Sequence, residues 1–332
     1  MDQFSLEQLE NAVFSIQSNA DFNSVALAVF NYQAQNVPVY KQFLKLLNID
    51  PLTITQVEDI PFLPISLFKT QRIISADAKE EITFLSSGTT GMSQSQHLIQ
   101  KLALYEASFL KAFEQFYGAV DQYHILALLP SYLEREGSSL IYMVDALIKK
   151  SNSAHSNYYL HNLDELAEKL EMLDKAGEKV VLIGVSYALL DLMEKHVFQL
   201  SNTIIMETGG MKGKRKEMIK AELHALLKKG FGTKKIHSEY GMTELLSQAY
   251  SLGNELFHCP NWMKILIREP NDPFALLQEG QSGGINVIDL ANLYSCSFIA
   301  TQDLGKLHSN NTFEVLGRFD NSDIRGCNLL VQ

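Results

Sequence analysis

The chain has 332 residues, of which 46% are hydrophobic and 20% charged. This is the composition of a globular protein that can bury more than one core, in one large domain or two packed subdomains. A formal net charge of −10, and no basic run longer than "KGKRK", argue against nucleic-acid binding and against attraction to anionic membranes.

The N-terminal segment "MDQFSLEQLE" is acidic where a secretory signal would be basic, and no apolar run approaches the roughly 18 residues of a membrane span. The three cysteines, Cys259, Cys296 and Cys327, have no CxxC spacing. A disulfide framework or a zinc site is therefore not expected. We expect a soluble cytoplasmic protein with free thiols, no membrane span and no nucleic-acid partner.

The chain opens with predicted helices. Apolar residues recur at three and four positions in "SLEQLENAVFSI" and "FNSVALAVFNYQAQ", and the pattern continues after Pro38. The segment "IPFLPISLFKT" then contains two prolines, which break helices and favour an extended, docked segment. Residues 1–60 are expected to form a helical segment packed on a following core.

Strands and helices alternate in the middle of the chain. The predicted strands are "EITFL", "HILALL", "KVVLIGV", "NTIIMET" and "KKIHSEY", and segments with helical spacing follow them after loops. The helix over residues 219–227 is expected to stop at Gly230. Alternation of this kind predicts a largely parallel sheet covered by helices on both faces, and so an α/β core over residues 61–250.

The pattern changes after about residue 250. Short strands without long helices follow one another in "MKILIRE", "GGINVIDL", "SCSFIATQDLG" and "TFEVLGRFD". They predict a β-rich subdomain over residues 251–332.

The hydroxyl-rich loop "SSGTTG", residues 86–91, follows the first strand of the α/β core. Its glycines let the backbone turn freely, and its backbone and hydroxyl donors can surround phosphate oxygens. It is not a Walker loop, because Met92 and Ser93 follow Gly91 where a Lys-Ser/Thr pair is required. The alternative is a solvated turn.

A second polar segment, "HSEYGMTELLSQAY", comes where the last strand of the core ends. A carboxylate at the mouth of a sheet can hold Mg²⁺, an ion that takes oxygen ligands and often bridges to substrate phosphates. Glu244 is the candidate. In the simpler alternative, Thr243 caps a helix and Glu244 lies in its first turn.

A third pair of segments, "TQDLGKL" and "GRFDNSDIRGC", lies in the β-rich region. Asp303 could accept hydrogen bonds from two ribose hydroxyls, and Arg318 could reach ribose or phosphate. Taken singly, each residue is expected to be a surface charge.

In this order, "SSGTTG", "YGMTE", "DLG" and "GRFD" resemble the core motifs of the adenylate-forming superfamily of acyl-CoA synthetases, peptide-synthetase adenylation domains and luciferases. The resemblance covers residues from about 60 to the end. More specifically, the chain resembles the acyl-protein synthetase family typified by LuxE of bacterial luminescence. This closer resemblance rests on the segments "IPFLPISLFKT", "ETGGMKGKRKEM" and "RGCNLL".

The resemblance implies a set of contacts to ATP and Mg²⁺. The phosphates of ATP would lie against the loop formed by Ser86, Ser87, Gly88, Thr89, Thr90 and Gly91. The adenine would pass beside the backbone of Thr208, Gly209 and Gly210 and stack on Tyr240, which Gly241 follows. Thr243 would contact the α-phosphate and Glu244 would hold Mg²⁺. Asp303 would bind the ribose, with Arg318 close to it.

The chain departs from the family pattern twice. The phosphate loop continues as "GMSQSQH" where relatives commonly have a proline and a lysine. In larger members a mobile C-terminal domain with a catalytic lysine follows the "GRFD" position, whereas here the sequence stops after "RGCNLLVQ". The expected architecture is therefore the large N-terminal-type domain of these enzymes without the mobile lysine domain.

The expected reaction begins with attack of a carboxylate on the α-phosphorus of ATP. Charge screening and alignment suffice for that step, so no catalytic His or Cys is required. Cys327, with Arg325 two positions before it, would then accept the acyl group as a thioester and pass it to an acyl-accepting reductase or carrier protein. The alternative is a packed structural thiol. Cys296 is expected to lie in the core, and Cys259 has no activating neighbour.

Other polar residues receive structural interpretations. His97, His155 and His237 are expected to be mostly structural, although His237 could line an acyl pocket. Lys212, Lys214, Arg215 and Lys216 are interpreted as a solvated helix start, and the alternative is a cluster that reaches a polyphosphate.

The leading hypothesis is thus an AMP-forming acyl-protein synthetase that acts on a carboxylic acid, a fatty acid by resemblance. Two alternatives remain: a compact acyl-CoA or aryl-CoA ligase that uses a separate C-terminal domain, and a nucleotide-binding regulatory subunit.

Overall fold

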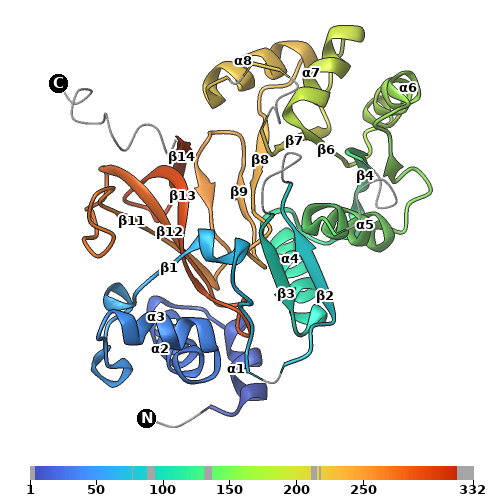
Figure 1. The fold of residues 1–332 in the computed structure, drawn as a ribbon. Helices are drawn as coiled ribbons and strands as arrows, with labels where there is room; N and C mark the ends of the chain where they lie inside the picture. Colours follow the sequence, from blue (N-terminus) through green and yellow to red (C-terminus); the bar gives the residue numbers. More distant parts are fainter. Residues whose placement is uncertain are drawn as a thin grey trace, which may run out of the picture. The chain divides into compact units, whose positions relative to one another are not determined.

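The computed structural model describes residues 4–76, 78–87, 94–130, 137–210, 215–216 and 218–319 (Figure 1). The chain forms two compact units. One unit combines Met1–Ala78 with Asn261–Gln332, and the other is Lys79–Pro260. This grouping differs from the three consecutive parts expected above, because the N-terminal helices fold with the β-rich end of the chain and not with the α/β core.

Three helices open the first unit, and each begins at a recognisable signal. Ser5 and Gln8 form a capping box at α1 (Leu6–Val13), and Ser18 caps α2 (Asn19–Asn36). Helix α3 (Pro38–Leu46) has proline in its first turn, where the missing N–H costs nothing. The proline segment at residues 60–70 is extended only at its start: β1 (Leu63–Pro64) is followed directly by the 3₁₀ helix η3 (Ile65–Lys69). Two further 3₁₀ turns, η1 (Pro51–Thr53) and η2 (Val57–Asp59), lie between α3 and this segment.

The strands of the first unit form an antiparallel meander in the region where the sequence predicts a β-rich subdomain. Its strands run in the order β11 (Met263–Arg268), β12 (Ser282–Asp289), β13 (Phe298–Leu307) and β14 (Phe313–Arg318). Strand β1 pairs in parallel with β13.

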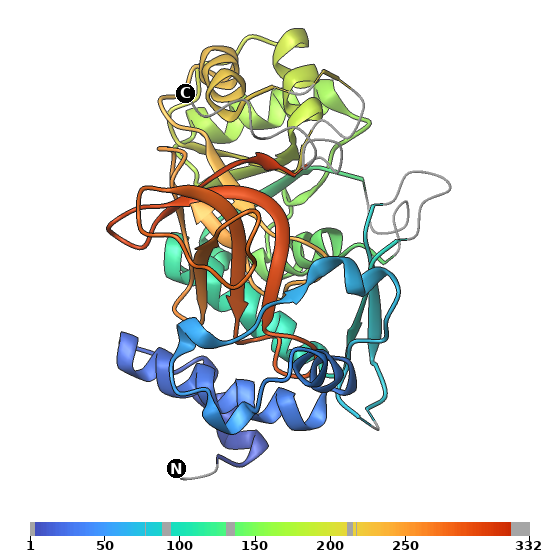
Figure 2. The ribbon, with the colours of Figure 1, turned by 60° about the vertical axis from the view of Figure 1, so that its left-hand side comes forward.

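One residue of α2 ties the helices to this sheet region. The buried Gln33 amide donates to the carbonyls of Asn292 and Leu293 at 3.0 and 2.8 Å, and its oxygen accepts from the N–H of Ser297 at 3.0 Å. Phe298 on β13 is fully buried and contacts the rings of Phe30 and Tyr40 at centroid distances of 6.0 and 6.2 Å. Figure 2 shows the N-terminal helices beside the strands of their own unit.

The second unit is built on parallel strands. Its sheet has the order β10-β9-β8-β7-β6-β4-β5, parallel from β8 to β5 and antiparallel at β9 and β10. All residues of β6 are buried, as an apolar run between two layers of helices requires. The strands are β4 (His124–Leu128), β5 (Asn157–Tyr158), β6 (Val180–Val185), β7 (Thr203–Thr208), β8 (His237–Tyr240), β9 (Ala249–Ser251) and β10 (Phe257–His258).

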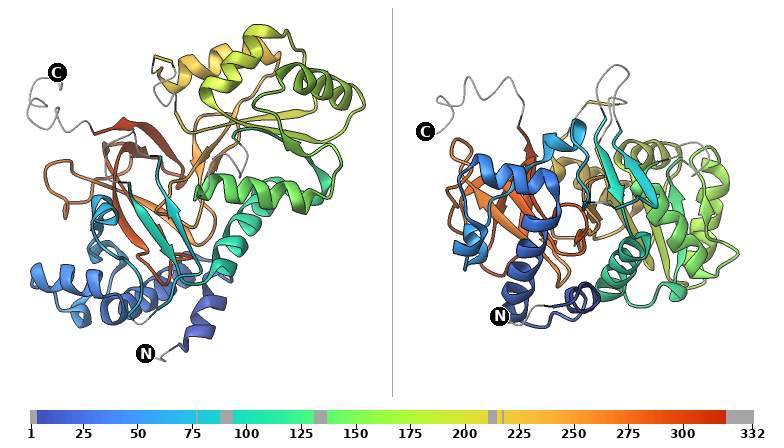
Figure 3. Two further views of the ribbon diagram at one scale, coloured as in Figure 1. Left: turned by 45° about the vertical axis from the view of Figure 1, so that its right-hand side comes forward. Right: turned by 60° about the horizontal axis from the view of Figure 1, so that its bottom comes forward.

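Helices cover both faces of these strands, which confirms the predicted fold class. Helices α7 and α8 lie on one side, and α4 and α5 lie on the other (Figures 2 and 3). The helical elements of this unit are α4 (Leu102–Tyr117), η4 (Val120–Gln122), α5 (Ser139–Ser151), α6 (Leu163–Lys175), α7 (Ser186–Lys195) and α8 (Lys220–Phe231).

The expected stop of α8 at Gly230 is wrong by two residues. The last helical residue is Phe231, and Gly232 caps the helix in the left-handed conformation at φ +66°. Gly230 lies inside the helix, where a Cβ would collide with Met193 of α7. This glycine therefore allows two helices to approach each other.

The strand predicted before the hydroxyl-rich loop is found, but it does not join the parallel sheet. Strand β2 (Ile82–Leu85) pairs antiparallel with β3 (Gln96–Ile99) in a separate two-stranded sheet. Among the described residues, no helix is long and apolar enough to cross a membrane.

Candidate active site

Two of the polar segments singled out in the sequence meet at one edge of the parallel sheet. Thr208 is the last residue of β7 and Tyr240 is the last residue of β8. The two strands pair in parallel, with Thr208 opposite Glu239. The turn formed by Thr208, Gly209 and Gly210 and the turn at Tyr240 and Gly241 therefore leave the carboxyl ends of neighbouring strands, where open α/β sheets bind ligands.

A carboxylate joins these two turns. Thr208 Oγ1 donates to Glu239 Oε2 at 2.5 Å, and both residues are buried. The other oxygen of Glu239 occupies the space that a Cβ on Gly241 would need, so position 241 has to be glycine as long as Glu239 stays in place. Glu239 was not identified from the sequence, since a glutamate at a strand end has no distinctive pattern.

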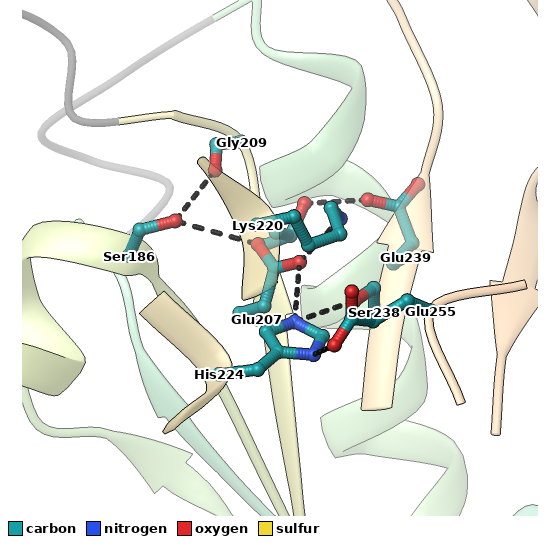
Figure 4. A network of polar contacts seen from close by, with 9 residues as sticks. Ser186, Glu207, Gly209, Lys220, His224, Ser238, Glu239 and Glu255 are labelled. Atoms are coloured by element: carbon teal, nitrogen blue, oxygen red, sulfur yellow. Dashed lines mark hydrogen bonds and ion pairs between the residues drawn. The ribbon is translucent and has the colours of Figure 1, made fainter. Parts of the chain in front are cut away.

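A buried polar network supports the end of β7 from below (Figure 4). Ser186, the first residue of α7, directs its hydroxyl at the carbonyl oxygen of Gly209 at 2.7 Å and lies 3.3 Å from Glu207 Oε2. Gly209 has a φ of +66°, a conformation that glycine adopts at low cost. The Gly209 carbonyl is thus held in place, and the backbone at Gly209 and Gly210 is exposed because these residues have no side chains.

Glu207 is an ionised carboxylate inside this network. Lys220 Nζ donates to its Oε1 at 2.6 Å, and His224 Nε2 lies 3.4 Å from the same oxygen. Burial alone would raise the pKa of Glu207, but the His224 hydrogen bond and the Lys220 charge outweigh burial and lower the pKa to about 2. The network therefore holds a fixed charge beneath the turn.

Thr243 and Glu244 lie in a turn and not at the start of a helix. The N–H of Leu245 donates to the carbonyl of Met242 at 3.1 Å, and β9 follows at Ala249. The helix-cap alternative is therefore wrong, because the apolar run after Glu244 leads into a strand of the sheet. His97 on β3, which is fully buried, places Nδ1 2.7 Å from the carbonyl oxygen of Thr243. Since a carbonyl only accepts, this Nδ1 carries the proton.

Glu244 is buried, with 6% of its surface exposed. Among the described residues, no group of three or more His, Cys, Asp or Glu side chains could hold a metal ion. The single carboxylate of Glu244 fits the manner in which Mg²⁺ usually binds beside nucleotides, with one or two carboxylates and the remaining ligands from phosphates and water.

The start of the hydroxyl-rich loop is fixed by backbone pairing. Ser86 Oγ accepts from the N–H of Ser95 at 2.9 Å, and the Ser86 N–H donates to the Ser95 carbonyl at 3.0 Å. The Ser86 hydroxyl keeps its own proton to donate, and Ser87 is exposed. The predicted phosphate-binding residues Gly88, Thr89, Thr90 and Gly91 lie outside the described residues.

Asp303 and Arg318 lie side by side in the first unit. They are paired across β13 and β14, and Arg318 Nε donates to Asp303 Oδ1 at 2.9 Å. The side chain of Asp303 is only 7% exposed, whereas that of Arg318 is 74% exposed. The expectation of a surface charge is therefore wrong for Asp303, which lies within a strand and not after it.

Cys296 lies in the core, and His237 is hydrogen-bonded, as expected for these two residues. Cys296 is buried, and burial raises the pKa of its thiol to about 12. Cys259 is half-buried, and Cys327 lies outside the described residues. His237 Nδ1 lies 3.2 Å from the hydroxyl of Tyr117, and burial lowers the pKa of His237 to about 4.

In the basic segment before α8, the described residue Arg215 is paired with acidic side chains. Arg215 forms ion pairs with Asp191 and Glu194 of α7 and lies before α8 begins at Lys220, so the expected solvated helix start is wrong for this residue. Lys212 and Lys214 lie outside the described residues.

The fold is similar to that of solved structures of MatB and of a CoA ligase. An ATP-bound MatB from Rhodopseudomonas palustris superposes with a TM-score of 0.54 at 17% identity, over 71% of this chain and 47% of that one. A 2-hydroxyisobutyryl-CoA ligase in an open conformation with 2-HIB-AMP and CoA superposes with a TM-score of 0.65 at 11% identity, over 92% of this chain and 77% of that one. The chain thus spans about half the length of MatB.

Sequence comparison gives the family. A curated relative, the long-chain-fatty-acid–luciferin-component ligase of Vibrio harveyi, is 22% identical over 340 residues, which cover 95% of this chain and 89% of the relative. The family described as "Acyl-protein synthetase, LuxE" matches residues 12–332. The chain therefore belongs to the LuxE family of acyl-protein synthetases.

Proposed function

We propose that this protein activates a carboxylic acid by converting it, with ATP, to an acyl-adenylate and pyrophosphate, and then transfers the acyl group to a protein cysteine. One observation carries the first step. The turns at Thr208 and Tyr240 leave adjacent parallel strands and are tied together by Glu239. A long-chain fatty acid is the proposed substrate, because the Vibrio harveyi relative is named for one.

The chain's own residues would bind and align the nucleotide. The exposed backbone at Gly209 and Gly210 offers a surface for the adenine, whose other face Tyr240 would cover. The hydroxyls of the loop at residues 86–91 would donate to phosphate oxygens. Thr243 would donate to the α-phosphate. The hydrogen bond from His97 to the Thr243 carbonyl sets the position of Thr243 relative to the strands.

Glu244 would hold Mg²⁺, which when bound screens the negative charge of the phosphates from the attacking carboxylate. Asp303 would accept from the ribose hydroxyls while Arg318 holds one of its oxygens. No proton needs to be removed from a carboxylate that is already ionised at neutral pH, so the adenylation step requires no general base.

The acyl group would pass from the adenylate to the thiol of Cys327. The thiolate attacks the acyl carbon, the bond to the AMP oxygen breaks, and AMP leaves with that oxygen. An acyl-accepting reductase or carrier protein would then receive the acyl group from the thioester.

Acid-dependent exchange of labelled pyrophosphate into ATP tests the proposal. We expect exchange that requires Mg²⁺ and rises with chain length among straight-chain acids. Exchange at background with every acid tried would contradict the proposal and favour a regulatory nucleotide-binding role. Free acyl-CoA formed by the isolated chain when coenzyme A is added would instead indicate the acyl-CoA ligase.

A further inference from the structure

Arg268 is the last residue of β11, and its side chain contacts β13, the strand that carries Asp303. It is half-buried, and burial lowers its pKa while the charge of Asp303 opposes that shift. Its guanidinium donates to three oxygens: the carbonyl of Ile285 at 2.8 Å, Asn286 Oδ1 at 2.8 Å and the carbonyl of Thr301 at 2.6 Å. Such a planar fork of donors on three acceptors fixes the guanidinium in one place.

The acceptors of Arg268 mark an interruption in the pairing of β12 with β13. Gly284 pairs with Leu304 and Asn286 pairs with Ala300, so residues 301–303 of β13 lie opposite the single residue Ile285. Extra residues in one strand leave backbone groups without ladder partners and redirect the side chains next to them. Asp303 is one of the extra residues.

Side chains replace the missing ladder bonds. The carbonyl of Ile285 accepts from both Arg268 and Thr301 Oγ1, the latter at 2.8 Å. Thr301 Oγ1 in turn accepts from the N–H of Asp303 at 3.1 Å. Arg268 is therefore connected to the backbone of Asp303 through Thr301.

Gly284 leaves room for this arrangement. It faces Arg268 across the β11–β12 pair, and a Cβ at Gly284 would lie only 2.5 Å from Cζ of Arg268. The guanidinium thus passes over a strand position that only glycine allows.

We propose that Arg268 is a positioning residue for sugar recognition: it holds the bulge of β13 in the form that presents the Asp303 carboxylate to the ribose hydroxyls of ATP. This inference rests on the proposed function, because it takes Asp303 as the ribose-binding residue. It goes further because Arg268 is distant in sequence from the four motifs and is not expected to contact ATP.

The consequence is specific to the sugar. A residue that merely stabilises the unit would affect binding of all nucleotides alike. A residue that places Asp303 affects the preference for ATP over 2′,3′-dideoxy-ATP, since the two differ only in the hydroxyls that a carboxylate would bind.

The test measures the affinity of the full chain for ATP and for 2′,3′-dideoxy-ATP by calorimetry. Loss of charge-assisted hydrogen bonds predicts that the wild-type protein prefers ATP by about 10-fold or more. Asp303→Asn should reduce that preference. Arg268→Met should reduce it to within about threefold of the Asp303→Asn value.

Gly284→Ala is a second variant that retains Arg268. Its Cβ meets the movable end of the arginine side chain, so the variant displaces the guanidinium while leaving the strand backbone in place. We expect a reduced preference here too, which keeps the test valid if Arg268→Met does not fold. Lys264→Met is the matched control, because Lys264 is a cation on the same face of β11 and lies over the ring of Phe22 at 5.5 Å. It should retain the wild-type preference.

A wild-type preference that survives in Gly284→Ala and in any folded Arg268→Met protein, but is lost in Asp303→Asn, would overturn the role of Arg268. A wild-type protein without any preference would overturn it as well, since Asp303 would not then read the sugar. Sugar preference without acid-dependent pyrophosphate exchange would instead refute the proposed reaction and leave the role of Arg268 supported.

Discussion

His97 Nδ1 lies 2.7 Å from the carbonyl oxygen of Thr243, across 146 residues of sequence. The contact joins β3, the strand that follows the hydroxyl-rich loop, to the turn that carries Glu244. Both segments are proposed to contact the phosphates of ATP. The histidine thus fixes the spacing between β3 and the turn that carries Glu244.

His97→Phe should therefore lower the rate of adenylation more than it weakens nucleotide binding. The variant removes the hydrogen bond to Thr243, at a cost of about 1–3 kcal/mol where the carbonyl loses its donor. Steady-state pyrophosphate exchange would show a drop in kcat with a smaller change in KM for ATP. His161→Phe, at an exposed position in the same unit, serves as the control. A change confined to KM would contradict this assignment.

Glu244→Gln should weaken the response to Mg²⁺. The substitution keeps the size of the side chain but removes the charge that the ion would meet, so the Mg²⁺ concentration at half-maximal rate should rise about 10-fold or more. Titration of pyrophosphate exchange with Mg²⁺ measures it. Glu168→Gln, an exposed glutamate on α6, should behave as wild type. An unchanged rate at limiting Mg²⁺ would reject Glu244 as a ligand.

The lowered pKa of Glu207 predicts that the folded chain loses stability in acid. Its pKa is lowered from 4.5 to about 2 in the folded chain, so its contribution is complete above pH 4.5 and is lost as the pH falls toward 2. That contribution is on the order of 3 kcal/mol. Glu207→Gln should be less stable at neutral pH, and its free energy of unfolding should fall less between pH 4.5 and 2. Denaturant unfolding at several pH values measures both. Parallel curves for the two proteins would show that Glu207 carries no such linkage.

Cys327→Ser should leave adenylation intact and abolish covalent acylation of the chain. Incubation with labelled acid, ATP and Mg²⁺, followed by intact mass measurement, detects the thioester. Cys259→Ser, at the half-buried thiol, should still be labelled. Labelling that survives Cys327→Ser would eliminate the proposed acceptor.

The sequence predicts well those features that depend on local pattern. The strands at Val180–Val185 and Thr203–Thr208 follow from apolar runs, and the strands after residue 260 follow from short runs separated by turn residues. A helix was also predicted after the strand "KVVLIGV", but only beyond a loop, whereas α7 begins at Ser186 directly after β6. The pairing of β2 with β3 was missed because it depends on a contact across the loop.

The candidate site was predictable only where a motif identifies it. The turns at Thr208 and Tyr240 lie at strand ends, where the order of strands brings them together. The supporting residues have no such pattern. Arg268 reaches the bulge near Asp303 only through the pairing of β11, β12 and β13, and Glu239 meets Thr208 only because β7 and β8 are neighbours.

The central claim is that a carboxylate attacks the α-phosphorus of ATP, and isotope transfer tests it most directly. A fatty acid labelled with oxygen-18 in its carboxylate is incubated with ATP, Mg²⁺ and the wild-type protein, and the AMP released is examined by mass spectrometry. Because the bridging oxygen of an acyl-adenylate comes from the acid, the AMP should carry one heavy oxygen after acyl transfer to a thiol. AMP without the label, or label found in inorganic phosphate, would contradict the account.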